Sequence, residues 1–161
     1  MFAHLFYDAY SKTGKYELVY NGKTVNYFYK ITNAGEYKID IDFISTNSTV
    51  EQAVDIHLSE FVGDIYVNGK KYKTTRRSFP QLILSEKDSP KSITLDIVLR
   101  DGYIGISNAS EHDGRFVTLQ MNCAMIFEQL APNKIRCHCC DHTDTVDFDA
   151  LVFDMTIEKL S

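Results

Sequence analysis

The densest group of metal-binding side chain types in the sequence is the run Cys137-His138-Cys139-Cys140-Asp141-His142. Thiolate and imidazole groups are the ligands that zinc prefers. On a strand, successive side chains point to opposite faces, so Cys137 and Cys139 would point away from His138 and one tetrahedral site could not collect them all. A structural zinc site also normally takes two ligand pairs, and the sequence has one such cluster. The pattern therefore favours buried thiols over a zinc site.

Cysteine is among the most frequently buried residues and packs as a small hydrophobic side chain. We therefore expect the four cysteines to be mostly reduced thiols in the core: Cys123, Cys137, Cys139 and Cys140. The alternative is one cross-strand disulfide from Cys123 to Cys137 or Cys139, which have matching parity on consecutive candidate strands.

An acidic segment follows this run and carries four carboxylates within nine residues: Asp141, Asp144, Asp147 and Asp149. Calcium takes six to eight oxygen ligands in loose geometry, so closely spaced carboxylates predict a calcium site. The segment lacks the glycine pattern of an EF-hand. A solvated acidic turn that holds no ion is the alternative.

No signature of catalysis is present: the sequence has neither a nucleophile elbow nor a glycine-rich phosphate loop. A carboxylate pair for glycoside hydrolysis could come from Glu60, Asp64, Glu128 or Glu158. Such a pair must face a shared cleft at a set separation, and nothing in the sequence indicates one. We therefore expect a protein that is not an enzyme.

Aromatic side chains are the remaining chemical resource, with ten tyrosines, ten phenylalanines and no tryptophan. A tyrosine offers a flat apolar face and a hydroxyl, which suits the C–H face and hydroxyl rim of a sugar. We expect loop tyrosines to stack on the ligand and neighbouring polar residues to bind its hydroxyls. The predicted ligand-binding residues are Tyr66, Tyr72, Tyr103, Arg76, Arg77 and Asn108. The competing interpretation is that most of the tyrosines complete the core.

Charge and hydropathy exclude several classes of partner. The net charge of −5 argues against nucleic acid, because phosphate binding needs a basic face. The first residues do not resemble a signal peptide, and no run approaches the ~20 apolar residues that span a bilayer, so we expect no membrane insertion. A complete chain would be cytoplasmic, whereas a module of a larger secreted enzyme would be extracellular.

Alternating hydrophobicity identifies the elements that must position these residues. Aliphatic and aromatic side chains take every second position in 37–43, 54–58, 93–99, 117–127 and 151–157, which is the period of strands with one buried face. Asn-Gly pairs at 21–22 and 68–69 predict tight hairpins. The sequence predicts strands at 16–20, 24–31, 37–44, 54–61, 65–72, 92–100, 103–107, 115–127, 135–140 and 148–158, with an irregular stretch at 76–90 and a polar loop at 108–114. No stretch has a comparable period of 3.6. We therefore predict one all-β domain over residues 1–161, an antiparallel β-sandwich of the jelly-roll type.

Several of these segments occur in a recognisable order. They are the Ala-Gly-x-Tyr turn within 29–39, the Val-Asn-Gly-Lys hairpin within 65–70, the strand, glycine turn and strand over 93–106, and the closing strand 148–157. Together they resemble the jelly-roll carbohydrate-binding modules of the galactose-binding-like superfamily. The resemblance implies non-catalytic glycan recognition, often beside a structural calcium, as an accessory to a glycan-degrading enzyme or a cell-surface assembly. The alternatives are an oligomer-forming structural β-sandwich without sugar binding, and a glycan-active jelly-roll enzyme.

Overall fold

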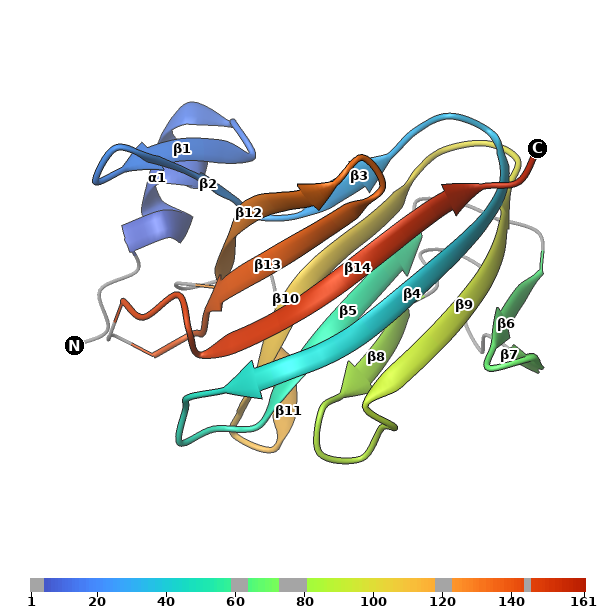
Figure 1. Ribbon diagram of the computed structural model, residues 1–161. Coiled ribbons are helices and arrows are strands. Elements are labelled where there is room, and N and C mark those ends of the chain that lie inside the picture. Colours follow the sequence, from blue (N-terminus) through green and yellow to red (C-terminus); the bar gives the residue numbers. More distant parts are fainter. Residues whose placement is uncertain (1–4, 59–63, 73–80, 118–122, 144–145) are drawn as a thin grey trace.

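The computed structural model describes residues 5–58, 64–72, 81–117, 123–143 and 146–161, which form two antiparallel sheets packed face to face (Figure 1). In spatial order, the first sheet contains β1 (Glu17–Tyr20), β2 (Lys23–Asn26), β12 (Ala124–Ala131), β13 (Lys134–Cys140), β14 (Leu151–Lys159), β4 (Gly35–Thr46), β9 (Ser92–Leu99), β6 (Ile65–Val67) and β7 (Lys70–Tyr72). The second contains β11 (Arg115–Val117), β10 (Ile104–His112), β5 (Gln52–Leu58) and β8 (Gln81–Ser85), and β3 (Tyr29–Ile31) also pairs with β10. The predicted all-β sandwich is confirmed.

The main core lies between the two sheets, and the alternating pattern explains it. On β4, Ile39 and Ile41 are fully buried, while Lys38 before them and Asp40 between them are only partly covered. Ile39 pairs with Leu95 of β9 on one side and with Ile157 of β14 on the other, so one buried row crosses neighbouring strands. Burial of such rows is the dominant favourable contribution to folding.

The two predicted Asn-Gly hairpins are confirmed. Asn21 and Gly22 join β1 to β2 with φ angles of 50° and 77°, and Asn68 and Gly69 join β6 to β7 with 49° and 81°. A two-residue turn with positive φ at both positions matches the right-handed twist of the flanking strands.

Several predicted boundaries are wrong. The single strand 24–31 is divided between β2 in the first sheet and β3, which pairs with β10 of the second. The polar loop 108–114 is instead the end of β10, which continues to His112 before a turn at Asp113 and Gly114. The single strand 115–127 is divided between β11 in the second sheet and β12 in the first. The stretch 76–90, predicted as irregular, contains β8. A period of two shows which face is buried, but it does not show to which sheet a segment belongs.

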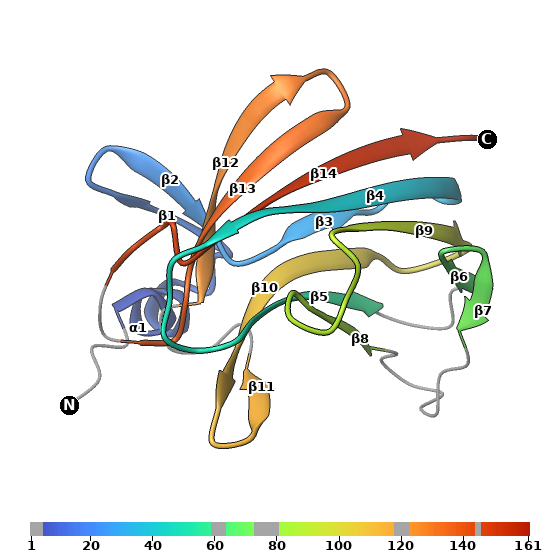
Figure 2. The same cartoon turned by 60° about the horizontal axis from the view of Figure 1, so that its bottom comes forward.

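Helix α1 (Leu5–Thr13) is absent from the sequence-based prediction, because nine residues are too few to establish a helical period. Together with β1 and β2 it forms what we call the N-terminal lobe, at one end of the first sheet (Figures 1 and 2). Phe6 of α1 is fully buried in a second hydrophobic cluster with Val25, Tyr27, Ala124 and Cys140. Within the described residues, no helix has the length and apolarity to span a membrane.

The four cysteines are free and buried, as predicted. Cys137 and Cys139 face the main core, whereas Cys140 belongs to the second cluster. The predicted alternation on β13 is therefore confirmed: Cys137 and Cys139 share one face, Cys140 lies on the other, and His138 is turned away from the main core.

Candidate functional site

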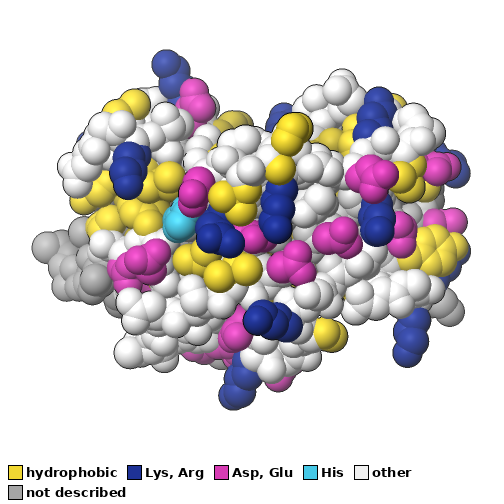
Figure 3. Space-filling model, viewed as in Figure 1, with side chains coloured by type: hydrophobic (Ala, Val, Ile, Leu, Met, Phe, Trp, Pro, Cys, Tyr) yellow, Lys and Arg dark blue, Asp and Glu magenta, His cyan; other side chains and the backbone are white. Residues whose placement is uncertain are grey.

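A pocket of about 640 Å³ lies where the N-terminal lobe meets the outer face of β12 and β13. Three chain segments line it: the tip of the β1–β2 hairpin, the outward side chains of β12 and β13, and the connection before β14. The lining residues are Tyr20, Asn21, Lys23, Ile126, Glu128, His138, Val146, Phe148 and Asp149. Figure 3 shows hydrophobic side chains gathered beside a histidine in this part of the surface.

Aromatic rings form the apolar part of the pocket. Tyr20 and Phe148 have ring centroids 6.5 Å apart, and both pack on Phe6 of α1, at 5.4 Å and 5.7 Å respectively. Phe6 is fully buried, whereas Tyr20 and Phe148 are only partly buried. The helix therefore supports two rings that remain accessible from the pocket.

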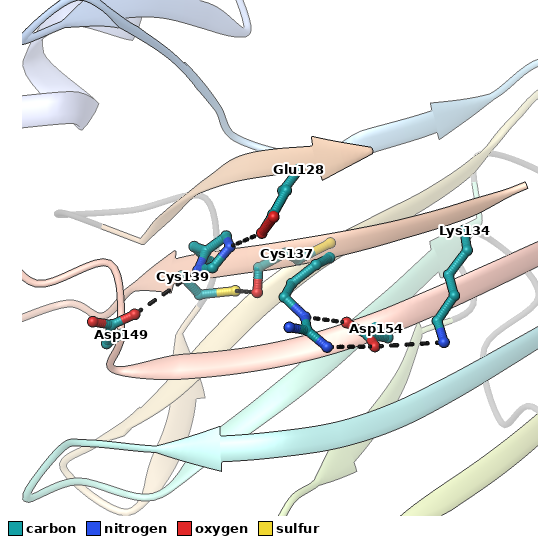
Figure 4. A network of polar contacts seen from close by, with 8 residues as sticks. Glu128, Lys134, Cys137, Cys139, Asp149 and Asp154 are labelled. Carbon is teal, nitrogen blue, oxygen red and sulfur yellow. Dashed lines mark hydrogen bonds and ion pairs between the residues drawn. The ribbon is translucent and has the colours of Figure 1, made fainter. Parts of the chain in front are cut away.

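Polar side chains form the rest of the wall. His138 lies between two carboxylates, with its Nε2 2.9 Å from Oε1 of Glu128 and its Nδ1 3.8 Å from Oδ1 of Asp149 (Figure 4). Asn21 and Lys23 at the hairpin tip are exposed and add an amide and an ammonium group. The pocket thus combines hydrogen-bond donors and acceptors with an apolar surface.

An adjacent ion-pair network fixes the strands beneath this wall. Asp154 of β14 is buried and accepts two hydrogen bonds from Arg136 of β13, at 2.8 Å and 3.1 Å, while Lys134 Nζ lies 3.8 Å away (Figure 4). In register, Arg136 pairs with Glu128 on one side and with Asp154 on the other. A bidentate guanidinium–carboxylate pair has a defined geometry, so it orders the strand that carries His138.

The predicted ligand-binding tyrosines lie outside this pocket. Tyr66 is 36% exposed on β6. Tyr72 on β7 donates a hydrogen bond of 3.4 Å to the carbonyl of Gln81. Tyr103 instead stacks on Phe28 at 6.2 Å, with Lys30 Nζ 4.5 Å from the centre of its ring. Tyr66 and Tyr72 therefore lie on the β6–β7 hairpin of the first sheet, whereas Tyr103 lies beside Phe28 and Lys30.

Of the predicted polar ligand-binding residues, Asn108 is only 1% exposed, and its Nδ2 donates to the carbonyl oxygen of Cys140 at 2.8 Å. Its predicted position in a surface loop is wrong, because β10 continues through it and turns its side chain toward the other sheet. Arg76 and Arg77 lie outside the described residues.

The predicted calcium ligands are divided. Asp141 and Asp147 line a smaller pocket of about 170 Å³, Asp149 lines the larger pocket, and Asp144 lies outside the described residues. Asp141 accepts hydrogen bonds from the hydroxyls of Ser48 and Thr143. No group of three or more His, Cys, Asp or Glu side chains in the described part of the chain is arranged to hold a metal ion. The calcium site stays a prediction.

The sequence-based reasoning missed most of this pocket. Glu128 was identified only as one of several carboxylates, and Tyr20 and Phe148 were not distinguished from other aromatic residues. One signal was available: Tyr20 and Lys23 flank an Asn-Gly turn, so the turn must hold both near its tip. No feature of the sequence shows that this tip meets residues 146–149.

Comparisons of the chain with protein-family models, with curated proteins and with solved structures each found no match.

Proposed function

We propose that the protein is a non-catalytic carbohydrate-binding domain and that the 640 Å³ pocket holds the sugar. The observation that carries this proposal is the pairing of Tyr20 and Phe148 with a polar rim in one pocket. The resemblance of several segments to galactose-binding-like modules agrees with it, although the binding residues differ from those that the sequence suggested.

The chemistry of the lining suits a sugar ring. The C–H face of a pyranose can pack on Tyr20 or Phe148, in the way that apolar surfaces pack on aromatic rings. Sugar hydroxyls both donate and accept hydrogen bonds, and the rim offers both partners: Glu128 and Asp149 accept, whereas Lys23 donates. Ligand pockets are commonly about 300–1,000 Å³ and mostly apolar with a few oriented polar groups, and this pocket falls in that range.

The charges of the rim indicate which sugars fit. The rim carries two carboxylates, Glu128 and Asp149, and one lysine, Lys23. Both carboxylates contact the imidazole of His138. A sulfated sugar or a uronic acid would meet the carboxylates and be repelled. We therefore propose a neutral mono- or disaccharide unit as the ligand.

A glycan array followed by calorimetric titration tests this proposal. The wild type should bind neutral glycans and not sulfated ones. Phe148→Ala should weaken binding tenfold or more, and Glu128→Gln should weaken it several-fold. The matched control is Tyr66→Ala, which removes an exposed ring far from the pocket and should leave the affinity unchanged.

Phe148 also packs on Phe6, so its replacement can lower stability. Glu128 is half exposed, so its replacement keeps the fold and tests the same pocket independently. The proposal is wrong if no neutral glycan binds at millimolar concentration, or if Tyr66→Ala abolishes binding while Glu128→Gln has no effect.

A further inference from the structure

Two histidines that do not line the pocket have ring nitrogens that face each other. His112 ends strand β10, and His142 lies just beyond the end of β13. The Nδ1 of His112 is 3.2 Å from the Nε2 of His142. His142 is almost fully buried, while the side chain of His112 is 28% exposed and reaches the surface.

The outer nitrogen of each ring has an oxygen partner. His142 Nδ1 lies 2.6 Å from the hydroxyl of Ser110, and His112 Nε2 lies 3.5 Å from a carboxylate oxygen of Asp113. Histidines that bind metals characteristically use the second nitrogen in this way, since a carboxylate or hydroxyl partner fixes the tautomer and the ring orientation. Both rings therefore have the surroundings of metal ligands.

The tautomers of the two rings decide which nitrogens face each other with lone pairs. In the tautomer that places the proton of His112 on Nε2, toward the carboxylate of Asp113, His112 Nδ1 presents a lone pair to His142. If His142 likewise donates from Nδ1 to Ser110, its Nε2 presents a lone pair at the same point. In that pair of tautomers the two lone pairs, 3.2 Å apart, would repel each other, and a cation between them would remove that repulsion.

The distance between the two nitrogens suits such an ion. Zinc binds imidazole nitrogen at 2.0–2.1 Å, and with the nitrogens 3.2 Å apart these bonds would meet at roughly 100–106°, near the tetrahedral angle. The ring centroids are 4.7 Å apart and the ring planes are inclined by 64°. The two rings are therefore inclined to each other at this contact and do not lie in one plane.

We propose that His112 and His142 bind one first-row transition-metal ion of the kind that imidazole prefers, such as Zn²⁺. The described residues supply two ligands, and water from the exposed side of His112 completes the coordination. Burial, together with the neighbouring His112, lowers the pKa of His142, although nearby carboxylates oppose this; a neutral imidazole is the form that binds metals. Where Nε2 of His142 carries its proton in the absence of metal, binding moves that proton to Nδ1, beside the Ser110 hydroxyl, and each imidazole keeps one proton.

The test is titration of the chelator-treated full chain with Zn²⁺, followed by calorimetry and by NMR of ¹⁵N-labelled histidines. One ion should bind per chain, and the His112 Nδ1 and His142 Nε2 resonances should shift together. His112→Gln should weaken binding at least tenfold. Ser110→Ala, which removes the hydroxyl beside His142 Nδ1 together with its contact to Cys123 Sγ, should weaken it by roughly 10–100-fold.

The matched control is His138→Gln, which removes a histidine that also contacts carboxylates and should leave zinc binding unchanged. His112 is partly exposed at the end of its strand, so His112→Gln should fold, and far-UV circular dichroism will verify this. If this variant does not fold, the shifts of the His112 Nδ1 and His142 Nε2 resonances in the wild type show whether these nitrogens bind zinc. The proposal is overturned if zinc does not saturate at one ion per chain, if those two resonances stay unchanged, or if only His138→Gln abolishes binding. A neutral hydrogen-bonded pair that ignores zinc would be the result in the first two cases.

Discussion

The imidazole of His57 lies directly over Gly105, its partner on the neighbouring strand. A methyl group added at Gly105 would lie 2.2 Å from His57 Nε2, far inside van der Waals contact. The ring is held there by Asp55, whose buried carboxylate is 3.2 Å from His57 Nδ1. Gly105 is therefore required by the close approach of a side chain.

Gly105→Ala should lower the free energy of unfolding by about 1–3 kcal/mol, because the His57 ring must move away from Asp55 to make room. Urea denaturation measures the change. In a His57→Ala background the clash is absent, and the same substitution should be neutral or stabilising, since alanine restricts the unfolded chain more than glycine does. An equal cost in both backgrounds would contradict this explanation.

Asn108→Ala should destabilise the protein by about 1–3 kcal/mol. In the wild type the Asn108 amide donates a 2.8 Å hydrogen bond to the carbonyl oxygen of Cys140, and the substitution leaves that buried carbonyl without this donor. Thermal denaturation will show the loss. Glycan affinity should not change, since Asn108 does not line the pocket. Asn133→Ala, at an exposed turn, is the control and should stay within about 0.5 kcal/mol of the wild type. Weaker glycan binding in a fully folded Asn108→Ala protein would disprove our placement of the site.

A pair of substitutions at Asn21 separates the turn from the ligand. Asn21 has a φ of 50°, which glycine adopts freely and alanine adopts at a cost of about 1–2 kcal/mol. Asn21→Gly should keep the stability of the hairpin and weaken sugar binding by removal of the amide. Asn21→Ala should destabilise the hairpin and also weaken sugar binding. The idea fails if the two variants bind sugar as well as the wild type does.

The cysteines should be inert in the folded protein. Burial raises the pKa of Cys123 and of Cys140 to about 12, so both stay as thiols at pH 8 and should not react with a disulfide reagent until the protein unfolds. The unfolded chain loses these protons near the ordinary cysteine pKa of ~8.5, whereas the folded chain keeps them to about 12. The folded state therefore binds more protons between these values, and stability should fall as pH rises from about 9 to 12, by up to about 1.4 kcal/mol per pH unit per thiol.

Urea denaturation between pH 8 and pH 11 checks this slope. Cys123→Ser removes one of the thiols and should make the curve shallower, although the protein becomes less stable overall. Rapid labelling of the native protein at pH 8 would show instead that at least one cysteine is accessible.

The sequence allowed prediction of whatever depends on local periodicity. The rows that contain Ile39 and Ile41, and the opposed faces of Cys137 and His138, follow from the period of two alone. The Asn-Gly turns follow from backbone sterics. These features need no knowledge of distant partners, and the structure confirms them.

The pocket could not be predicted in that way. Tyr20 and Phe148 meet only because α1 places Phe6 behind both rings, and nine residues give no helical period that would reveal α1. The division of 115–127 between two sheets has a similar cause. The alternation continues through both strands, while the information that assigns each to its sheet resides in its pairing partners.

The β1–β2 turn and the connection that precedes β14 form much of the pocket wall. Both are attached to the first sheet, whose opposite face packs on the main core. Substitutions at the exposed positions of these two connections, such as Lys23 and Asp149, can change the lining of the cavity while the residues of the main core stay untouched. Exchanging a few surface positions can therefore reshape this pocket on a constant scaffold.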